Sequence, residues 1–151
     1  MSDTGHPAER RLVFRLLPYW RQIAGANAMP SAANLVPDAI PDMWPHCFVL
    51  RFGASNEPVY DQVGTAFAAE LNEPIIGVPV GNTPVETLLR QATRYWDMVA
   101  DKKVPISLGG EFRHRRGELL LYRSIILPLS NDGGRIDHML GAANCRAVVV
   151  Q

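Results

Sequence analysis

One run of basic residues and one isolated arginine could each recognise an anion. The first is the run Arg113, His114, Arg115 and Arg116, which could bind phosphate or an acidic protein surface, although charged side chains at a hairpin tip are usually just solvated. The second is Arg123, which shares one side of an alternating segment with leucine and isoleucine residues. A cation among apolar neighbours needs either an anionic ligand or an internal Asp or Glu partner, and both alternatives stay open.

Aromatic residues are the candidates for a small-molecule pocket. Packing in a core accounts for most of them, but aromatic rings with polar tips also suit a small, partly aromatic ligand. Together with Arg123, the candidate pocket residues are Tyr60, Phe67, Tyr95, Trp96, Phe112 and Tyr122.

No arrangement in the sequence indicates catalysis or a metal site. Nucleophile-elbow, glycine-rich phosphate-loop and H-E-x-x-H patterns are absent, so we predict no catalytic residue and no enzyme activity. An acid/base pair such as Tyr60 with Asp61, or His114 with Glu111, is disfavoured because strand alternation sends the two members to opposite faces. A scattered active site of a small α+β enzyme is the least favoured alternative.

Histidine and cysteine residues are predicted to be structural. His46, His114 and His138 lie in or beside expected strands, isolated from carboxylate and cysteine clusters. The two cysteines, Cys47 and Cys145, have no zinc-like spacing and are too few for a disulfide scaffold, which favours a reducing compartment.

The composition limits the classes of partner. The chain has 15 Lys plus Arg and 15 Asp plus Glu residues, so no net field attracts nucleic acid or an anionic membrane. With 47% hydrophobic residues in 151, it can bury one globular core. The first apolar run is interrupted by Arg15, Pro18 and Arg21, so it is neither signal peptide nor membrane span, and we expect a cytoplasmic protein.

These residues are positioned by two expected regions, 1–45 and 46–151. The first contains an amphipathic helix from Leu12 to Ile23 and a connector with four prolines between Pro30 and Pro45. The second begins with two short strands, Cys47 to Gly53 and Val59 to Val63, which we expect to form a hairpin.

A helix and three strands complete the second region. The sequence T-P-V-E predicts a helix with Thr83 as N-cap, Pro84 at the first position and Glu86 at the third, continuing to Lys102 before Pro105 ends it. Alternating patterns then predict a meander of three strands, at 106–114, 118–129 and 135–150.

The middle strand of the meander has apolar residues on both faces. Leu119, Leu121, Ile125 and Leu127 alternate with Leu120, Tyr122 and Ile126. Both faces of the sheet must therefore be covered, one by the capped helix and the other by the N-terminal helix or a second subunit. The candidate interaction residues are Leu12, Leu16 and Trp20.

The order of elements resembles that of a PAS domain. Residues from about Arg10 to Arg146 resemble a bacterial family of short, single-domain PAS proteins, in the strings RLLPYWRQIAG, MPSAANLVPDAIPDMWPHCFVL, LLYRSIILPLS and IDHMLGAANCRAV. The resemblance implies an α+β fold, a five-stranded antiparallel sheet with helices on one face and an N-terminal helix extension.

The resemblance also implies a function. We expect a stand-alone sensory or regulatory module that contacts a signalling protein such as a histidine kinase, forms a homodimer, and in the alternative binds a small metabolite in its cavity. Haem is disfavoured because the stretch from Val85 to Lys102 lacks a histidine. Flavin is disfavoured because Asn144-Cys145-Arg146, which resembles the cysteine motif of flavin light sensors, lies in a strand instead of a helix, so the cofactor stays unknown.

Overall fold

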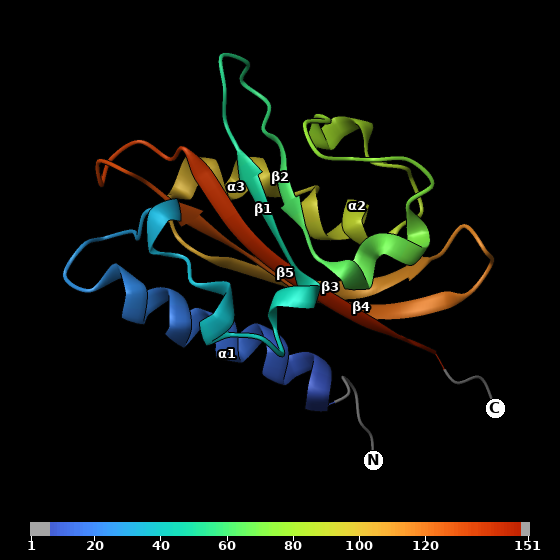
Figure 1. The fold of residues 1–151 in the computed structure, drawn as a ribbon. Coiled ribbons are helices and arrows are strands. Elements are labelled where there is room, and N and C mark those ends of the chain that lie inside the picture. The colour runs from blue at the N-terminus through green and yellow to red at the C-terminus, as the bar shows by residue number, and fades with distance from the viewer. Residues whose placement is uncertain (1–6, 149–151) are drawn as a thin grey trace.

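The structure is a computed structural model that describes residues 7–148, with side chains from Leu12 onward. Its centre is one five-stranded antiparallel sheet in the order β2-β1-β5-β4-β3 (Figure 1). The strands are β1 (Cys47–Arg51), β2 (Val59–Val63), β3 (Ile106–Arg113), β4 (Leu119–Leu129) and β5 (His138–Ala147). The predicted hairpin and meander are confirmed, and β5 joins them by pairing with both β1 and β4.

Helices cover both faces of this sheet. α1 (Pro7–Ala24) lies on one face, whereas α2 (Leu88–Thr93) and α3 (Trp96–Lys102) lie on the other (Figure 1). Short 3-10 helices occupy the connections: η1 (Ala32–Asn34), η2 (Pro37–Ala39), η3 (Trp44–His46), η4 (Thr65–Glu70) and η5 (Val80–Asn82). The α+β class and the five-stranded sheet predicted from the sequence are therefore confirmed. Within residues 7–148, every helix is too short or too polar to span a bilayer.

The prediction of one long helix capped at Thr83 is wrong. α2 begins at Leu88, where the Thr87 side chain accepts a hydrogen bond from the backbone N–H of Arg90 at 3.1 Å. Glu86 has a φ of 68°, which an α-helix does not contain. The helical segment is also interrupted before α3, where Tyr95 leaves the helical region with φ −106° and ψ 22°.

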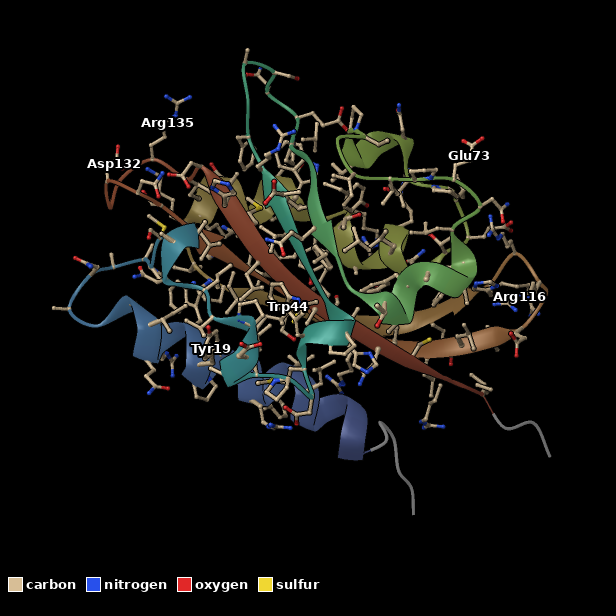
Figure 2. All side chains as sticks on the ribbon, viewed as in Figure 1. Tyr19, Trp44, Glu73, Arg116, Asp132 and Arg135 are labelled. Atoms are coloured by element: carbon tan, nitrogen blue, oxygen red, sulfur yellow. The ribbon has the colours of Figure 1, made fainter. Side chains whose placement is uncertain are left out.

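The face covered by α1 has its own apolar cluster, which we call the outer core. From α1 it contains Leu12, Val13, Leu16, Tyr19 and Trp20, and from the sheet Cys47, Val49, Ile125, Leu127, Leu129, Leu140 and Ala142. The Trp20 Nε1–H donates to the carbonyl of Pro128 at 2.8 Å and so fixes α1 to β4. Side chains fill the layer between α1 and the sheet, where Tyr19 and Trp44 are labelled in Figure 2.

The proline-containing connector returns along α1. The Val36 N–H donates to the Tyr19 hydroxyl at 2.8 Å, and Arg15 forms an ion pair with Asp42 at 2.6 Å. These contacts hold α1 between the connector and the sheet. Burial raises the pKa of the Cys47 thiol to about 12, so this cysteine of the outer core is not an available nucleophile.

Candidate functional site

The aromatic candidate residues meet on the face covered by α2 and α3. Five of them are buried in one apolar cluster, which we call the inner core, and Trp96 packs at its edge. They come from β2, η4, β3, β4 and the segment between α2 and α3: Tyr60, Phe67, Phe112, Tyr122 and Tyr95. The sequence prediction that these side chains converge is therefore confirmed, and their contact with a ligand stays a prediction.

The Tyr60 hydroxyl is satisfied by two threonines. It lies 2.5 Å from the Thr83 Oγ1 and 3.2 Å from the Thr93 Oγ1. Thr83 donates its own proton to the Val80 carbonyl at 2.6 Å, and Thr93 donates to a carbonyl of α2, so Tyr60 is the donor of the short bond. Burial raises the pKa of Tyr60, which keeps the phenol protonated in this role.

Tyr95 is held in the same way. Its hydroxyl lies 2.8 Å from the Ser124 Oγ, and Ser124 donates to the carbonyl of Leu108 at 3.3 Å. Tyr95 therefore donates to Ser124, and burial raises the pKa of Tyr95. The Tyr122 hydroxyl accepts a hydrogen bond from the Arg94 guanidinium at 3.2 Å. The phenol protons of Tyr60 and Tyr95 are thus used inside the protein.

Aromatic rings occupy the space between the helices and the sheet. Phe48 is fully buried beside Gly141, and its ring meets Phe67 edge to face with centroids 6.1 Å apart. Phe112 and Tyr122 make a second such pair at 5.7 Å. The candidate pocket residues therefore act as packed core in this structure.

Arg123 does not belong with the aromatic residues. It follows Tyr122 on β4, and strand alternation places it on the opposite face, where its side chain lies near Gly109. Among residues 12–148, whose side chains the structure describes, no carboxylate forms an ion pair with it, so the internal partner that the sequence left open is not found there. The grouping of Arg123 with the other six residues is wrong.

The candidate interaction residues of α1 are buried within the chain itself. The exposed fractions of Leu12, Leu16 and Trp20 are 6%, 0% and 7%, because all three pack in the outer core. They cover the sheet face that the sequence predicted to need a cover. A partner reaches them only if α1 leaves the sheet.

A buried carboxylate that the sequence analysis missed holds the start of α2. The Glu70 oxygens accept hydrogen bonds from the backbone N–H groups of Leu88 and Leu89, both at 2.8 Å. An anion at a helix N-terminus is favourable because the free N–H groups carry partial positive charge. The signal in the sequence is an acidic residue inside the apolar run AFAAEL.

His114 lies against this carboxylate, with its Nε2 3.4 Å from the Glu70 Oε1. The Arg116 backbone N–H donates to the His114 Nδ1 at 3.3 Å, which assigns the proton of a neutral ring to Nε2. His138 lies 2.8 Å from Asp137. Each of these two histidines therefore contacts a single carboxylate, and among the described residues neither belongs to a cluster that could hold a metal ion.

The other sequence candidates do not form a site. The Tyr60–Asp61 and Glu111–His114 pairs do not assemble, because Asp61 instead pairs with Arg51 at 3.4 Å and His114 contacts the carboxylate of η4. Among the side chains that the structure describes, no group of three His, Cys, Asp or Glu residues could hold a metal ion. Cys145 lies on β5, as predicted.

The basic run is divided between different contacts. Arg113 donates to the Gly117 carbonyl at 2.6 Å, and Arg115 donates to the main-chain carbonyl of Glu70. Arg116 is exposed at the hairpin tip (Figure 2). The run is therefore not one continuous anion site.

One protein family and several solved structures are similar to this chain. The family described as PAS domain matches residues 8–144. A solved light-oxygen-voltage domain studied with a flavin analogue has a TM-score of 0.50 and 10% identity, over 74% of this chain and 83% of that one. The dark structure of the Aureochrome1 LOV photoreceptor has a TM-score of 0.49 and 14% identity, over 76% and 84%. A PAS domain from Colwellia psychrerythraea has a TM-score of 0.44 and 13% identity, over 74% of this chain and 95% of that one. No curated protein matches the sequence.

Proposed function

Because the chain belongs to the PAS domain family, we propose that it is a regulatory module that acts by contacting another signalling protein. PAS domains are sensory modules typical of signalling. The observation that carries the proposal is the filled inner core. The hydroxyls of Tyr60 and Tyr95 donate hydrogen bonds to Thr83 and Ser124. The face of the sheet covered by α2 and α3 is therefore suited to packing more than to ligand recognition.

The outward side of α1 is the surface that we propose for a homodimer. Phe14 is 60% exposed, although the same helix buries Leu12, Leu16 and Trp20 against the sheet. A large exposed aromatic ring on a helix that is otherwise fixed to the core is suited to protein contact. In this arrangement the three buried residues hold α1 in place, and its outward side meets the second copy.

The assembly is tested by light scattering after size-exclusion chromatography of the full chain. We expect the unaltered protein to be a dimer and Phe14→Ser to be a monomer with the same circular dichroism spectrum. Ile76→Ser is the matched control, because Ile76 is 57% exposed but lies outside α1. A dimer that survives Phe14→Ser, or an unaltered protein that is a monomer, would refute the proposed surface.

A second test removes the cover of the outer core. Deletion of residues 1–25 should expose the apolar side chains of Val49, Leu127 and Leu140, which are buried in that core, and should cause aggregation or a changed oligomeric state. A soluble species with the unchanged assembly contradicts this expectation. The partner itself, for which a histidine kinase is our candidate, is identified by co-purification of the tagged chain from its native cell.

The alternative function is a sensor that binds a metabolite between the helices and the sheet. Such a ligand must displace packed rings such as Phe48 or replace the bonds of Tyr60 and Tyr95. Native mass spectrometry of freshly purified protein separates the two functions. A retained small molecule favours the sensor, and a bare chain favours action through protein contacts.

A further inference from the structure

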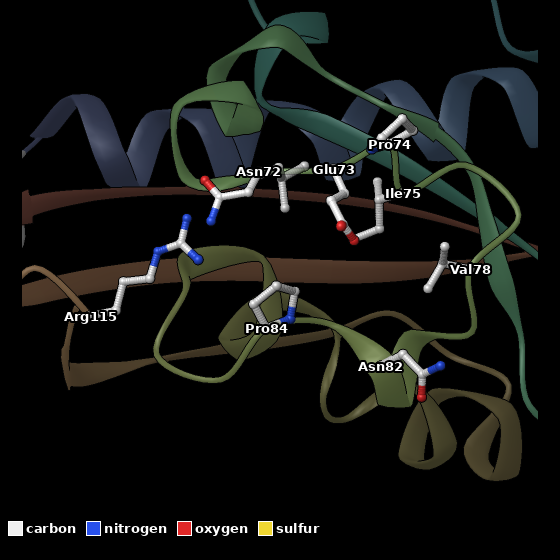
Figure 3. Close-up of a pocket in the computed structure, with 9 residues that line it drawn as sticks. Asn72, Glu73, Pro74, Ile75, Val78, Asn82, Pro84 and Arg115 are labelled. Carbon is white, nitrogen blue, oxygen red and sulfur yellow. The ribbon is translucent and has the colours of Figure 1, made fainter.

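A hollow lies at the surface between the η4–η5 connection and the tip of the β3–β4 hairpin (Figure 3). Its volume is about 290 Å³. Sites for drug-sized molecules begin at about 300 Å³, so this volume suits a smaller ligand, of the size of an amino acid. The residues that line it are Leu71, Asn72, Glu73, Pro74, Ile75, Val78, Asn82, Pro84 and Arg115. It lies apart from the inner core of aromatic residues.

The walls of the hollow are fixed to the fold. The segment that carries Ile75 and Val78 is held to β2, because Tyr60 donates its N–H to the Val78 carbonyl at 3.1 Å and accepts from the Gly77 N–H at 2.7 Å. The opposite wall precedes α2, where the Thr83 side chain is held by the Tyr60 hydroxyl. A site built from fixed walls loses little entropy when it binds.

Arg115 closes one end of the hollow and is itself positioned by two bonds. Its backbone N–H donates to the Glu86 carbonyl at 3.1 Å, and its Nη2 donates to the carbonyl of Glu70. A guanidinium has five N–H donors, so four remain for a ligand. In Figure 3 the amide of Asn72 lies at the same end of the hollow as this guanidinium.

Glu73 supplies the opposite charge. Its exposed side chain lines the hollow, and Figure 3 labels it between Asn72 and Pro74. Within residues 12–148 it forms no ion pair, and it forms none with Arg115, although both line the same hollow. One cation and one anion therefore face the hollow without neutralising each other.

The remaining lining is apolar, with Ile75 at its base only 7% exposed and Val78 and Pro84 beside it. A ligand that matches all three features has a carboxylate, an ammonium group and an apolar side chain. We propose that the hollow binds a free apolar α-amino acid, with its carboxylate on Arg115 and its ammonium group on Glu73. The apolar side chain then lies against Ile75, Val78 and Pro84. This inference depends on the hollow alone and not on the proposed dimer or partner.

The test uses the full chain labelled with ¹⁵N and titrated with L-leucine, L-isoleucine, L-methionine and L-phenylalanine. At least one amino acid should give saturable shifts, localised to the amides of residues 72–78, with a dissociation constant of about 1 mM or lower. Arg115→Gln and Glu73→Gln should each weaken binding at least about tenfold, because each removes a charge-assisted contact. Arg113→Gln and Glu111→Gln are the matched controls on the same hairpin and should bind as the unaltered chain does.

Modified ligands assign the two ends. The amide of the best amino acid lacks the carboxylate, so its affinity should be insensitive to Arg115→Gln and still fall in Glu73→Gln. The N-acetyl derivative should behave in the opposite way. Glu73 is exposed and forms no ion pair within residues 12–148, so Glu73→Gln remains informative if Arg115→Gln proves unstable. The proposal is overturned if no amino acid saturates at tenfold higher concentration, if Glu73→Gln binds normally, or if the N-acetyl amide binds as well as the free amino acid.

Discussion

A single methyl group added at Gly141 tests whether the inner core is filled. In Gly141→Ala the new Cβ would lie 2.1 Å from the Cζ of Phe48 and 2.3 Å from its Cε1, far inside van der Waals contact. Phe48 is fully buried and its ring is held edge to face against Phe67. The ring therefore has no solvent to swing into, and either it or β5 must shift.

The expected loss of stability follows from two opposing terms. Overpacking a core costs about 1 to 3 kcal/mol. Replacing glycine by alanine in a strand raises the free energy of unfolding by roughly 0.5 to 1 kcal/mol, because glycine loses more backbone freedom on folding. Because a Cβ 2.1 Å from a ring carbon lies at the severe end of overpacking, the net fall in the free energy of unfolding is about 2 kcal/mol. Gly53→Ala is the matched control, since a Cβ at Gly53 meets nothing within 4 Å, and its effect should stay within about 0.5 kcal/mol.

Urea unfolding followed by tryptophan fluorescence gives the free energies, and a double-mutant cycle with Phe48→Leu identifies the cause. The smaller side chain makes room for the methyl group, so Gly141→Ala should be neutral or slightly stabilising in that background, a coupling of about 2 kcal/mol. If Gly141→Ala leaves stability unchanged in the original chain, the core has free space and the reasoning against an internal ligand fails. A penalty that persists with Phe48→Leu would place the strain in the backbone.

Three further predictions concern the contacts that hold the fold. Trp20→Phe leaves the Pro128 carbonyl without its indole donor and should lower the free energy of unfolding by about 1 to 2 kcal/mol in urea titrations; no change would mean that this bond does not hold α1. Glu70→Gln replaces a carboxylate that accepts two N–H bonds from α2 and should cost about 2 kcal/mol, with loss of amide hydrogen-exchange protection confined at first to α2. The Arg135 N–H and adjacent donors lower the pKa of Asp132 to about 2, below its unfolded value, so this carboxylate stabilises the fold above about pH 4 and the contribution is lost as the pH falls toward 2. The difference in Tm between the original chain and Asp132→Ala should accordingly shrink between neutral pH and pH 2, and a constant difference would contradict the assignment.

The strand pattern was sufficient to predict the sheet. β4 alternates between Tyr122 and Ile126 on one side and Ile125 and Leu127 on the other, and the inner and outer cores divide the four residues in that way. Alternation is a property of the backbone and needs no knowledge of distant residues. It also located Arg123 correctly on the face opposite Tyr122, and only the grouping of the two into one pocket was wrong.

The start of α2 could not be predicted in the same way. T-P-V-E satisfies the local rules for a capped helix, but the Thr83 hydroxyl is engaged with Tyr60, which is 23 residues earlier in the chain. The helix N-terminus instead receives the Glu70 carboxylate, 18 residues before Leu88. A local pattern indicates only which hydrogen-bond partners are near in the sequence. The buried Thr83 hydroxyl and the buried Glu70 carboxylate instead bind partners that the tertiary fold brings to them.

Glu70 also explains two contacts at the hairpin tip that the sequence did not indicate. Its carboxylate binds the first amides of α2 and contacts His114, and its main-chain carbonyl accepts from Arg115. One residue of η4 therefore fixes the helix, the imidazole and the guanidinium. These contacts to His114 and Arg115 could not be predicted locally, because the residue that makes them lies about 45 residues earlier in the chain. The main-chain carbonyl of Glu70 holds the Arg115 guanidinium beside the hollow that Glu73 also lines. The buried residue whose contacts could not be predicted locally therefore also positions the cation of the hollow.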